Sequence, residues 1–278
     1  MRNLLKPATS RDRSIIRNLA RAIASATSAV SHLIRACFSF NGQQRYESRF
    51  RLLDSLTRRL GFRIYNRNLY WVDDKEVLET VKQVNERYVH VPDRKYTLYS
   101  MALSAANLPG DSAECGVFQG EGSYLICLAN ESSDQKVHHI FDSFEGLSSP
   151  IEEDLPSDER AYHWKKHDLA VSLDSVKTKL LRFKNVNFYK GWIPSRFSEV
   201  AQCKFSFVHI DVDLYEPTLD SISFFYERMV PGGIILCDDY GSTICPGAKK
   251  AFDEFMADKV EGPVIHLTTG QGFIIRHY

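Results

Sequence analysis

The sequence predicts an open, doubly wound α/β fold, with a seven-stranded, mostly parallel sheet and helices on both of its faces. Short apolar runs alternate with helix-length segments from about residue 94 to the C-terminus, which is typical of parallel strands joined by right-handed crossovers. The last two runs are separated only by Gly270 and Gln271, a spacing that predicts a closing antiparallel hairpin.

The predicted strands are rich in β-branched and aromatic residues and are bounded by turn-forming residues. In chain order, the runs are SAECGV, VHHIFDSF, NVNFYKGW, FSFVHIDVD, GGIILCDDY, PVIHLTT and GFIIRHY. A helix is predicted over YTLYSMALSAANL, before the first strand, because Pro109 and Gly110 follow it and end the helical pattern.

The chain is predicted to have three segments: a basic amphipathic helical extension over 1–46, a helical segment over 47–93, and the α/β domain over 94–278. The first segment carries Arg and Lys with a single acid, Asp12, and has apolar residues at helical spacing. Three interpretations of it stay open: a docking or oligomerisation helix, a helix lying on a membrane surface, and a transit-type peptide. The first favours a homo-oligomer.

Composition limits the classes of function. Lys plus Arg and Asp plus Glu balance at 35 each, which argues against a protein that binds nucleic acid through a basic surface. No apolar stretch reaches the roughly 20 residues of a membrane span, so we expect a soluble, cytoplasmic protein. The six cysteines form no C-x-x-C pair and no zinc-ligand spacing, and free buried thiols are expected.

A glycine-rich turn follows the first predicted strand, in the sequence ECGVFQGEGS. Gly116 and Gly120 would let the backbone turn sharply and approach a bound cofactor closely. The spacing from Glu114 is acid-x-Gly-x-x-x-Gly and not the G-x-G-x-x-G of dinucleotide sites. It favours a cofactor with an amino-acid end and no pyrophosphate, although a turn without a ligand is the alternative.

Two further strand ends carry candidate nucleoside contacts. Asp142 ends the second strand, where an acid can accept both hydroxyls of a ribose. Trp192 follows the third strand and could stack on an adenine. A helix cap for Asp142 and a core position for Trp192 are the structural alternatives.

The strongest pattern is a pair of acidic clusters, Asp211 with Asp213 and Asp238 with Asp239, each directly after an apolar strand. Both should emerge at the same edge of the sheet, where four carboxylates would repel one another without a cation. Oxygen ligands in this number suit Mg²⁺ or Mn²⁺ and not zinc. Helix capping by each pair is the alternative.

Together, these motifs resemble the macrocin O-methyltransferase (TylF-type) family, whose members methylate sugars on antibiotics. The motifs that carry the resemblance lie in order over about 94–278 and read LPGDSAECGVFQGEGS, HIFDSFEGL, KGWIPSRF, HIDVDLYEPT, GGIILCDDYG and PGAKKAFDEF. The resemblance implies the Rossmann-like fold of methyltransferases that use S-adenosylmethionine (SAM), and a divalent cation that assists methyl transfer to a sugar hydroxyl.

The resemblance also implies roles for individual residues. Those expected to line the SAM site are Glu114, Gly116, Gly120, Ser123, Asp142, Ser143, Gly191 and Trp192. Asp211, Asp238 and Asp239 are expected to bind the metal, and Asp213 to act as the general base. The catalytic roles of Asp211 and Asp213 could be exchanged, and His209 is expected to pack within its strand.

The region that contacts the acceptor is the least defined part of the sequence. The polar stretch LSSPIEEDLPSDERAYHWKKHD could be a lid over a glycoside, with contacts from Tyr162, His163, Trp164 and His167, or a solvated loop. The helix before the first strand and the basic extension depart from the antibiotic enzymes. Two other functions are the alternatives: a nicotinamide-dependent oxidoreductase and a non-catalytic binding or scaffold protein.

Overall fold

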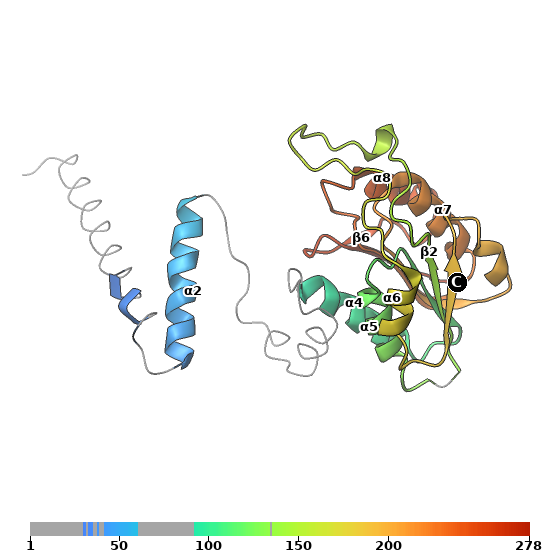
Figure 1. Ribbon diagram of the computed structural model, residues 1–278, viewed down its shortest axis with the longest axis horizontal. Helices are drawn as coiled ribbons and strands as arrows, with labels where there is room; N and C mark the ends of the chain where they lie inside the picture. Colours follow the sequence, from blue (N-terminus) through green and yellow to red (C-terminus); the bar gives the residue numbers. More distant parts are fainter. Residues whose placement is uncertain (1–29, 32, 36–37, 39–41, 61–91, 134) are drawn as a thin grey trace, which may run out of the picture. The chain divides into compact units, whose positions relative to one another are not determined.

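The computed structural model describes residues 30, 31, 33–35, 38, 42–60, 92–133 and 135–278 (Figure 1). The chain divides into two compact units, 1–69 and 70–278. Helix α2 (Gly42–Arg59) belongs to the first unit, and the boundary predicted at residue 46 falls inside it. Most of the basic extension and Cys37 lie outside the described residues.

Helix α2 leaves several apolar side chains accessible. Leu53 and Leu56 are each more than half exposed. Self-association through the N-terminal region stays a prediction, as does its contact with a membrane. Among the described residues, no helix is both long and apolar enough to cross a bilayer.

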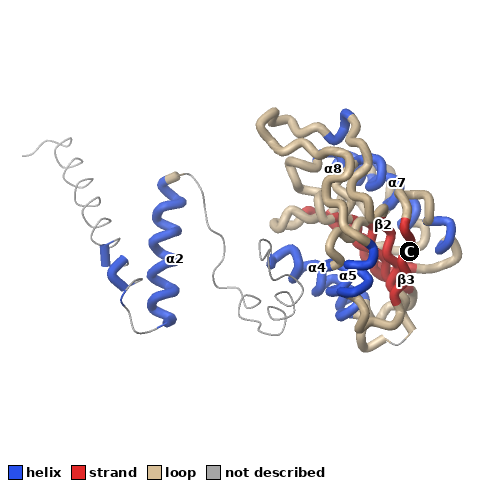
Figure 2. Tube along the Cα trace, in the orientation of Figure 1, coloured by secondary structure: helices blue, strands red, loops and turns tan. Residues whose placement is uncertain are grey.

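The second unit contains a seven-stranded sheet with the order β3-β2-β1-β4-β5-β7-β6. Figure 2 shows its strands in red, with helices in blue beside them. Only β7 runs antiparallel to its neighbours β5 and β6, so the predicted fold and its closing antiparallel pair are confirmed. The strands are β1 (Asp111–Cys115), β2 (His138–Asp142), β3 (Val186–Lys190), β4 (Phe205–Ile210), β5 (Met229–Cys237), β6 (Ile265–His266) and β7 (Gly272–Ile275).

Helices pack on both faces of this sheet. On one face, α4 (Pro92–Ala105) and α5 (Glu121–Ala129) bury Leu98 and Ile126 against Phe207 of β4. On the other face, α7 (Tyr215–Tyr226) and α8 (Pro246–Met256) bury Phe225 and Phe252. Among the residues that the structure describes, the shorter helices are α6 (Leu173–Lys179), η2 (Glu152–Asp154) and η3 (Phe197–Val200).

Strand β4 is central, and all six of its residues are buried, as expected for a parallel strand covered on both faces. Side chains alternate along a strand, so His209 points to the same face as Phe207, under α4 and α5. Asp211 follows His209 by two residues and therefore emerges on that side at the end of the strand.

The ends of β1 and β4 approach each other closely at Gly116. Its φ is +76°, and a Cβ atom there would lie 2.0 Å from the backbone oxygen of Asp211. Only glycine satisfies both conditions, because other residues rarely adopt positive φ and would overlap the neighbouring backbone. The described cysteines form no disulfide with one another, and four of the five are buried.

We expect Gly116→Ala to lower the free energy of unfolding by at least about 2 kcal/mol more than Gly262→Ala does. Both glycines have a φ of +76°, but the space around Gly262 is open, so the difference isolates the contact with β4. Urea denaturation of the two variants and the wild type measures it. Equal losses in both variants would contradict the close approach.

Candidate functional site

A cavity of about 590 Å³ opens at the carboxyl ends of β1, β2 and β4. This is where an open parallel sheet binds its ligands. Six of the residues predicted from sequence line it: Gly116, Asp142, Ser143, Trp192, Asp211 and Asp213. Its apolar wall includes Phe118, Leu147, Leu169, Ile193, Pro194 and Leu214.

Asp142 joins the loops that follow β1 and β2. Its Oδ2 accepts a hydrogen bond from the Val117 amide at 2.8 Å, and its Oδ1 accepts one from the Phe144 amide at 2.6 Å. Burial raises the pKa of Asp142, although both amides favour the ionised form. Each oxygen keeps lone pairs beyond these bonds, so the carboxylate organises the rim and can still accept hydroxyl donors.

Trp192 and Ser143 form another part of the rim. The Trp192 side chain is 37 % exposed, so its indole is not a core residue. The Ser143 hydroxyl donates to the Gly146 carbonyl at 2.8 Å and accepts from the Glu145 amide at 3.0 Å, which closes the turn after β2.

Glu114 and Ser123 are buried and are not among the residues that line the cavity. The Glu114 carboxylate is buried between the Ser123 hydroxyl, which donates to it, and His209 Nδ1 at 2.7 Å. Helix α5 passes so close that a Cβ atom at Gly122 would lie 2.0 Å from Glu114 Oε1. The Glu114 carboxylate therefore packs directly against the start of α5, where the glycine-rich turn ends. Gly120, at the start of α5, and Gly191 are also outside the lining.

The four predicted aspartates converge at the ends of β4 and β5. Donor atoms of Asp213 and Asp239 lie within 4.8 Å of each other, and so do those of Asp211 and Asp238. Burial and a neighbouring carboxylate raise the pKa of Asp211 to about 6 and that of Asp213 to about 7. The same two causes raise the pKa of Asp239 well above its ordinary value.

Asp238 differs because cationic and amide donors surround it. Arg94 Nη2 forms a short hydrogen bond with Asp238 Oδ2 and lies 2.6 Å from the Asp238 carbonyl oxygen. Gln271 Nε2 donates to Oδ1 at 2.6 Å, and His209 Nε2 lies 3.3 Å from the same oxygen. Although burial opposes ionisation, His209 and Arg94 hold the pKa of Asp238 well below its usual range.

The pKa of His209 is shifted in the opposite direction to that of Asp238, because His209 lies between two acids. Burial would lower its pKa, but the hydrogen bonds with Asp238 and Glu114 outweigh burial and raise it to about 10. The imidazole is therefore a buried cation at neutral pH. Its location within β4 agrees with the expectation of a packed strand histidine.

Arg94 and Lys95, on helix α4, were missed as site residues. Arg94 Nη2 also lies 3.3 Å from Asp239 Oδ1, and nearby Asp238 and Asp211 help to raise the pKa of Lys95 against the effect of its burial. No local motif marks these residues, since 144 positions separate Arg94 from Asp238. The only signal was the unusual sequence of the helix that carries them.

One oxygen of the cluster has no partner. Asp239 Oδ2 is buried, and no hydrogen bond to it forms among the described residues. A buried carboxylate oxygen without a donor is costly, and a cation would satisfy it. All four acids offer hard oxygen ligands, so the residues fit Mg²⁺ or Mn²⁺.

The stretch predicted as a lid or solvated loop is anchored to α7 and to the acidic cluster. Asp154 is buried and accepts a hydrogen bond from the Tyr215 amide, at the start of α7, at 2.7 Å. The Trp164 indole N–H lies 3.3 Å from the Cys245 sulfur, and the Cys245 thiol donates to Asp213 Oδ1 at 3.5 Å. Asp213 itself has a φ of +60°, which is uncommon for a residue other than glycine.

The other predicted lid contacts are less enclosed. Tyr162 is 53 % exposed and donates to Asp168 Oδ2, and His167 lies in hydrogen-bond contact with the Glu145 carbonyl. His163 is half-buried. Of the four predicted acceptor contacts, Trp164 is therefore the one that the structure connects to the acidic cluster, and the lid itself stays a prediction.

Comparison with known proteins identifies relatives of this chain. The family model for Macrocin-O-methyltransferase (TylF) matches residues 97–273, which is more than half of the chain. Demethyldecarbamoylnovobiocin O-methyltransferase from Streptomyces niveus is 31% identical over 159 residues, 54% of this chain and 60% of that protein.

A second relative is 8-demethyl-8-(2,3-dimethoxy-alpha-L-rhamnosyl)-tetracenomycin-C 4'-O-methyltransferase from Streptomyces olivaceus. It is 28% identical over 152 residues, 52% of this chain and 58% of that protein. The chain thus spans about three fifths of these relatives' length. The solved structure of the O-methyltransferase NovP matches with a TM-score of 0.56 and 26% identity, over 67% of this chain and 81% of that one.

We expect Arg94→Gln to lower the free energy of unfolding of the metal-free protein by about 2 kcal/mol or more at neutral pH. The substitution removes a mostly buried positive charge from between Asp238 and Asp239 and deprives both acids of their contact with the guanidinium. Chemical denaturation in the presence of a chelator measures the loss.

Arg160→Gln is the matched control, because Arg160 is exposed and pairs only at the surface with Asp158. This control should unfold like the wild type. If the two variants were equally stable, Arg94 would not be the counter-ion of the cluster.

Proposed function

Because the chain belongs to the macrocin O-methyltransferase (TylF) family, we propose that it transfers the methyl group of SAM to a hydroxyl of a sugar or glycoside, assisted by a divalent cation. The observation that carries the proposal is the convergence of four carboxylates beside a cavity whose rim has an acid and an indole. The four carboxylates support the proposed cation, and the acid and the indole of the cavity rim support a nucleoside cofactor.

The cavity rim offers the contacts that SAM needs. Asp142 would accept the ribose hydroxyls, and the half-exposed indole of Trp192 would stack on the adenine. Gly116, which has no side chain, lets the methionine end approach the backbone. Glu114 and Ser123 act indirectly, because their hydrogen bond and the contact with His209 hold the turn in place.

Asp211, Asp238 and Asp239 would hold Mg²⁺ or Mn²⁺. The unpartnered oxygen of Asp239 supports this assignment, and Asp238 would exchange its contact with Arg94 for one with the ion. When bound, the cation lowers the pKa of an acceptor hydroxyl and holds it in place. Arg94 stays close enough to balance the remaining negative charge.

Asp213 would take the proton from the acceptor hydroxyl. Asp213 lines the cavity, and the Cys245 thiol donates a hydrogen bond to one of its carboxylate oxygens. Its positive φ is found in neither ordinary strands nor ordinary helices. Methyl transfer from a sulfonium is an in-line displacement, so the enzyme mainly orients and deprotonates the acceptor. The alternative is that Asp211 is the base and Asp213 a metal ligand, and the geometry is compatible with both assignments.

Both curated relatives are named for O-methylation of natural products, one of them a rhamnosyl derivative. A deoxysugar hydroxyl is therefore the acceptor class that we propose. Trp164, which reaches the acidic cluster through Cys245, offers an aromatic face against which a sugar could pack.

Calorimetric titration with S-adenosylhomocysteine, the product of methyl transfer, tests the cofactor site. We expect the wild type to bind it, and Asp142→Ala to bind at least about tenfold more weakly because the ribose loses its acceptor. Asp174→Ala, at an exposed position on α6, is the matched control and should bind like the wild type. No binding by the wild type, with or without Mg²⁺, would exclude the methyltransferase function.

Methyl transfer from labelled SAM to a panel of deoxysugar glycosides tests the acidic cluster. We expect Mg²⁺ to stimulate turnover, and Asp213→Asn to reduce kcat by about 10²–10⁴-fold because the amide cannot accept the proton. Its affinity for S-adenosylhomocysteine should stay within a few-fold of the wild type. Unchanged turnover in Asp213→Asn would assign the base elsewhere, with Asp211→Asn as the next variant.

A further inference from the structure

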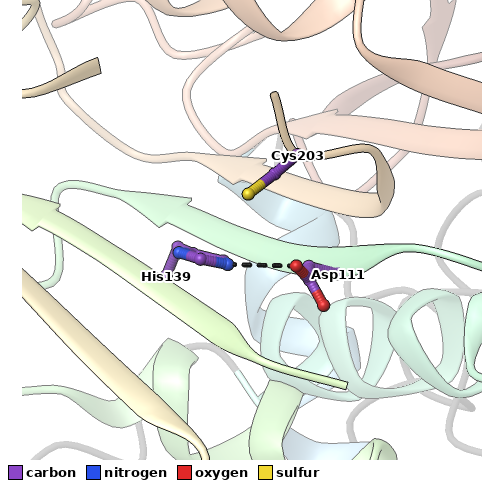
Figure 3. A group of neighbouring side chains, drawn as sticks. All are labelled: Asp111, His139 and Cys203. Atoms are coloured by element: carbon purple, nitrogen blue, oxygen red, sulfur yellow. Dashed lines mark hydrogen bonds and ion pairs between the residues drawn. The ribbon is translucent and has the colours of Figure 1, made fainter. Parts of the chain in front are cut away.

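A second group of side chains of the types that can bind metals lies at the edge of the sheet where the strands begin, opposite the cavity. Asp111 is the first residue of β1, His139 is the second residue of β2, and Cys203 precedes β4. One donor atom from each lies within 4.8 Å of the other two. Figure 3 shows the Cys203 thiol next to the Asp111 and His139 side chains, which a hydrogen bond joins.

We propose that these three side chains bind a Zn²⁺ ion, with a water molecule in the fourth position. The donor set of one thiol, one imidazole and one carboxylate suits zinc, whereas Mg²⁺ and Ca²⁺ require oxygen ligands. The site is therefore chemically distinct from the all-oxygen cluster at the other edge. It is independent of the proposed methyl transfer.

The imidazole is already oriented as a zinc ligand. His139 Nδ1 lies 2.9 Å from the Tyr189 hydroxyl, and the two rings stack with centroids 5.7 Å apart. In the ion-free protein an Nε2–H can donate to Asp111 Oδ2. With the ring proton on Nδ1 instead, where it can be donated to the Tyr189 oxygen, the lone pair of Nε2 is free for a metal, which is the usual arrangement around a histidine ligand. His139 is buried, so its ring has little freedom to turn.

The spacing between the nitrogen and the carboxylate also matches a tetrahedral site. His139 Nε2 and Asp111 Oδ2 are 3.2 Å apart, and two ligands each about 2.0–2.1 Å from zinc at the tetrahedral angle are about 3.3 Å apart. Asp111 Oδ1 accepts the Val137 amide at 3.0 Å, which directs Oδ2 toward His139. Burial would raise the pKa of Asp111, but the hydrogen bonds from His139 and Val137 outweigh it and lower the pKa.

Zinc binding would replace the proton of the Cys203 thiol. The sulfur donates its electron pair to the ion, and the proton leaves to solvent, so the net charge of the site rises by one. Cys203 and Asp111 are only half-buried, which gives the ion and its water a route from the surface. The bound ion would join the beginnings of β1 and β2 to the turn before β4.

Cobalt substitution of the full-length protein tests the site, because a thiolate ligand gives Co²⁺ a charge-transfer absorption band that oxygen and nitrogen ligands do not give. We expect one equivalent of Co²⁺ to produce this band in the chelator-treated wild type, and Zn²⁺ to abolish it by displacement. Cys203→Ser should lose the band. A wild type without the band would overturn the proposal.

Cys245→Ser is the matched control, because the Cys245 thiol also lies beside carboxylates, those of Asp213 and Asp239. It should keep the band, and a band that survives in Cys203→Ser but disappears in Cys245→Ser would place the ion at the catalytic edge and overturn the proposal. Asp111→Asn serves if Cys203→Ser does not fold. It should bind Zn²⁺ at least tenfold more weakly in competition with Co²⁺, and unchanged affinity would also overturn the proposal.

Discussion

Repulsion among four carboxylates at the ends of β4 and β5 is the constraint around which the site is built. Burial and close neighbours raise the pKa values of Asp211 and Asp213 to about 6 and 7, which shows how unfavourable full ionisation would be. Two positive groups offset this repulsion: the guanidinium of Arg94 on α4 and the imidazolium of His209 within β4. Burying several carboxylates together lowers the stability of the fold unless positive groups pair with them. The presence of this cluster therefore argues for a functional role of its negative charge.

A row of buried polar groups connects this cluster to the glycine-rich turn. Ser123, Glu114, His209 and Asp238 are joined in sequence by hydrogen bonds across β1, β4 and β5, on the face that α4 and α5 cover. Because each member satisfies the next, the proposed cofactor turn and the proposed metal ligands cannot shift independently. Glu114 therefore links the proposed cofactor turn to the proposed metal ligands, and the direct cofactor contact that its sequence motif predicts stays a prediction.

The stretch between β2 and β3 also contacts the acidic cluster and the helix that follows it. Asp154 ties it to the first amide of α7, and Trp164 contacts Asp213 through Cys245. Backbone anchoring at one point and an aromatic contact at another explain why a long polar segment can hold a defined path over the acidic cluster. The stretch therefore reaches Asp213 through Cys245, a residue that lies 81 positions after Trp164 in the sequence.

The order of apolar runs and the residues that follow them were sufficient to predict the sheet, its closing antiparallel pair and the convergence of Asp211, Asp213, Asp238 and Asp239. These features are local, because strand periodicity and the position of an acid at a strand end depend only on neighbouring residues. Arg94, Gln271, the Trp164–Cys245 contact and the Asp111–His139–Cys203 group could not be predicted in this way. Tertiary packing alone brings these side chains together, since no periodicity or short spacing relates residues that lie on separate elements many positions apart.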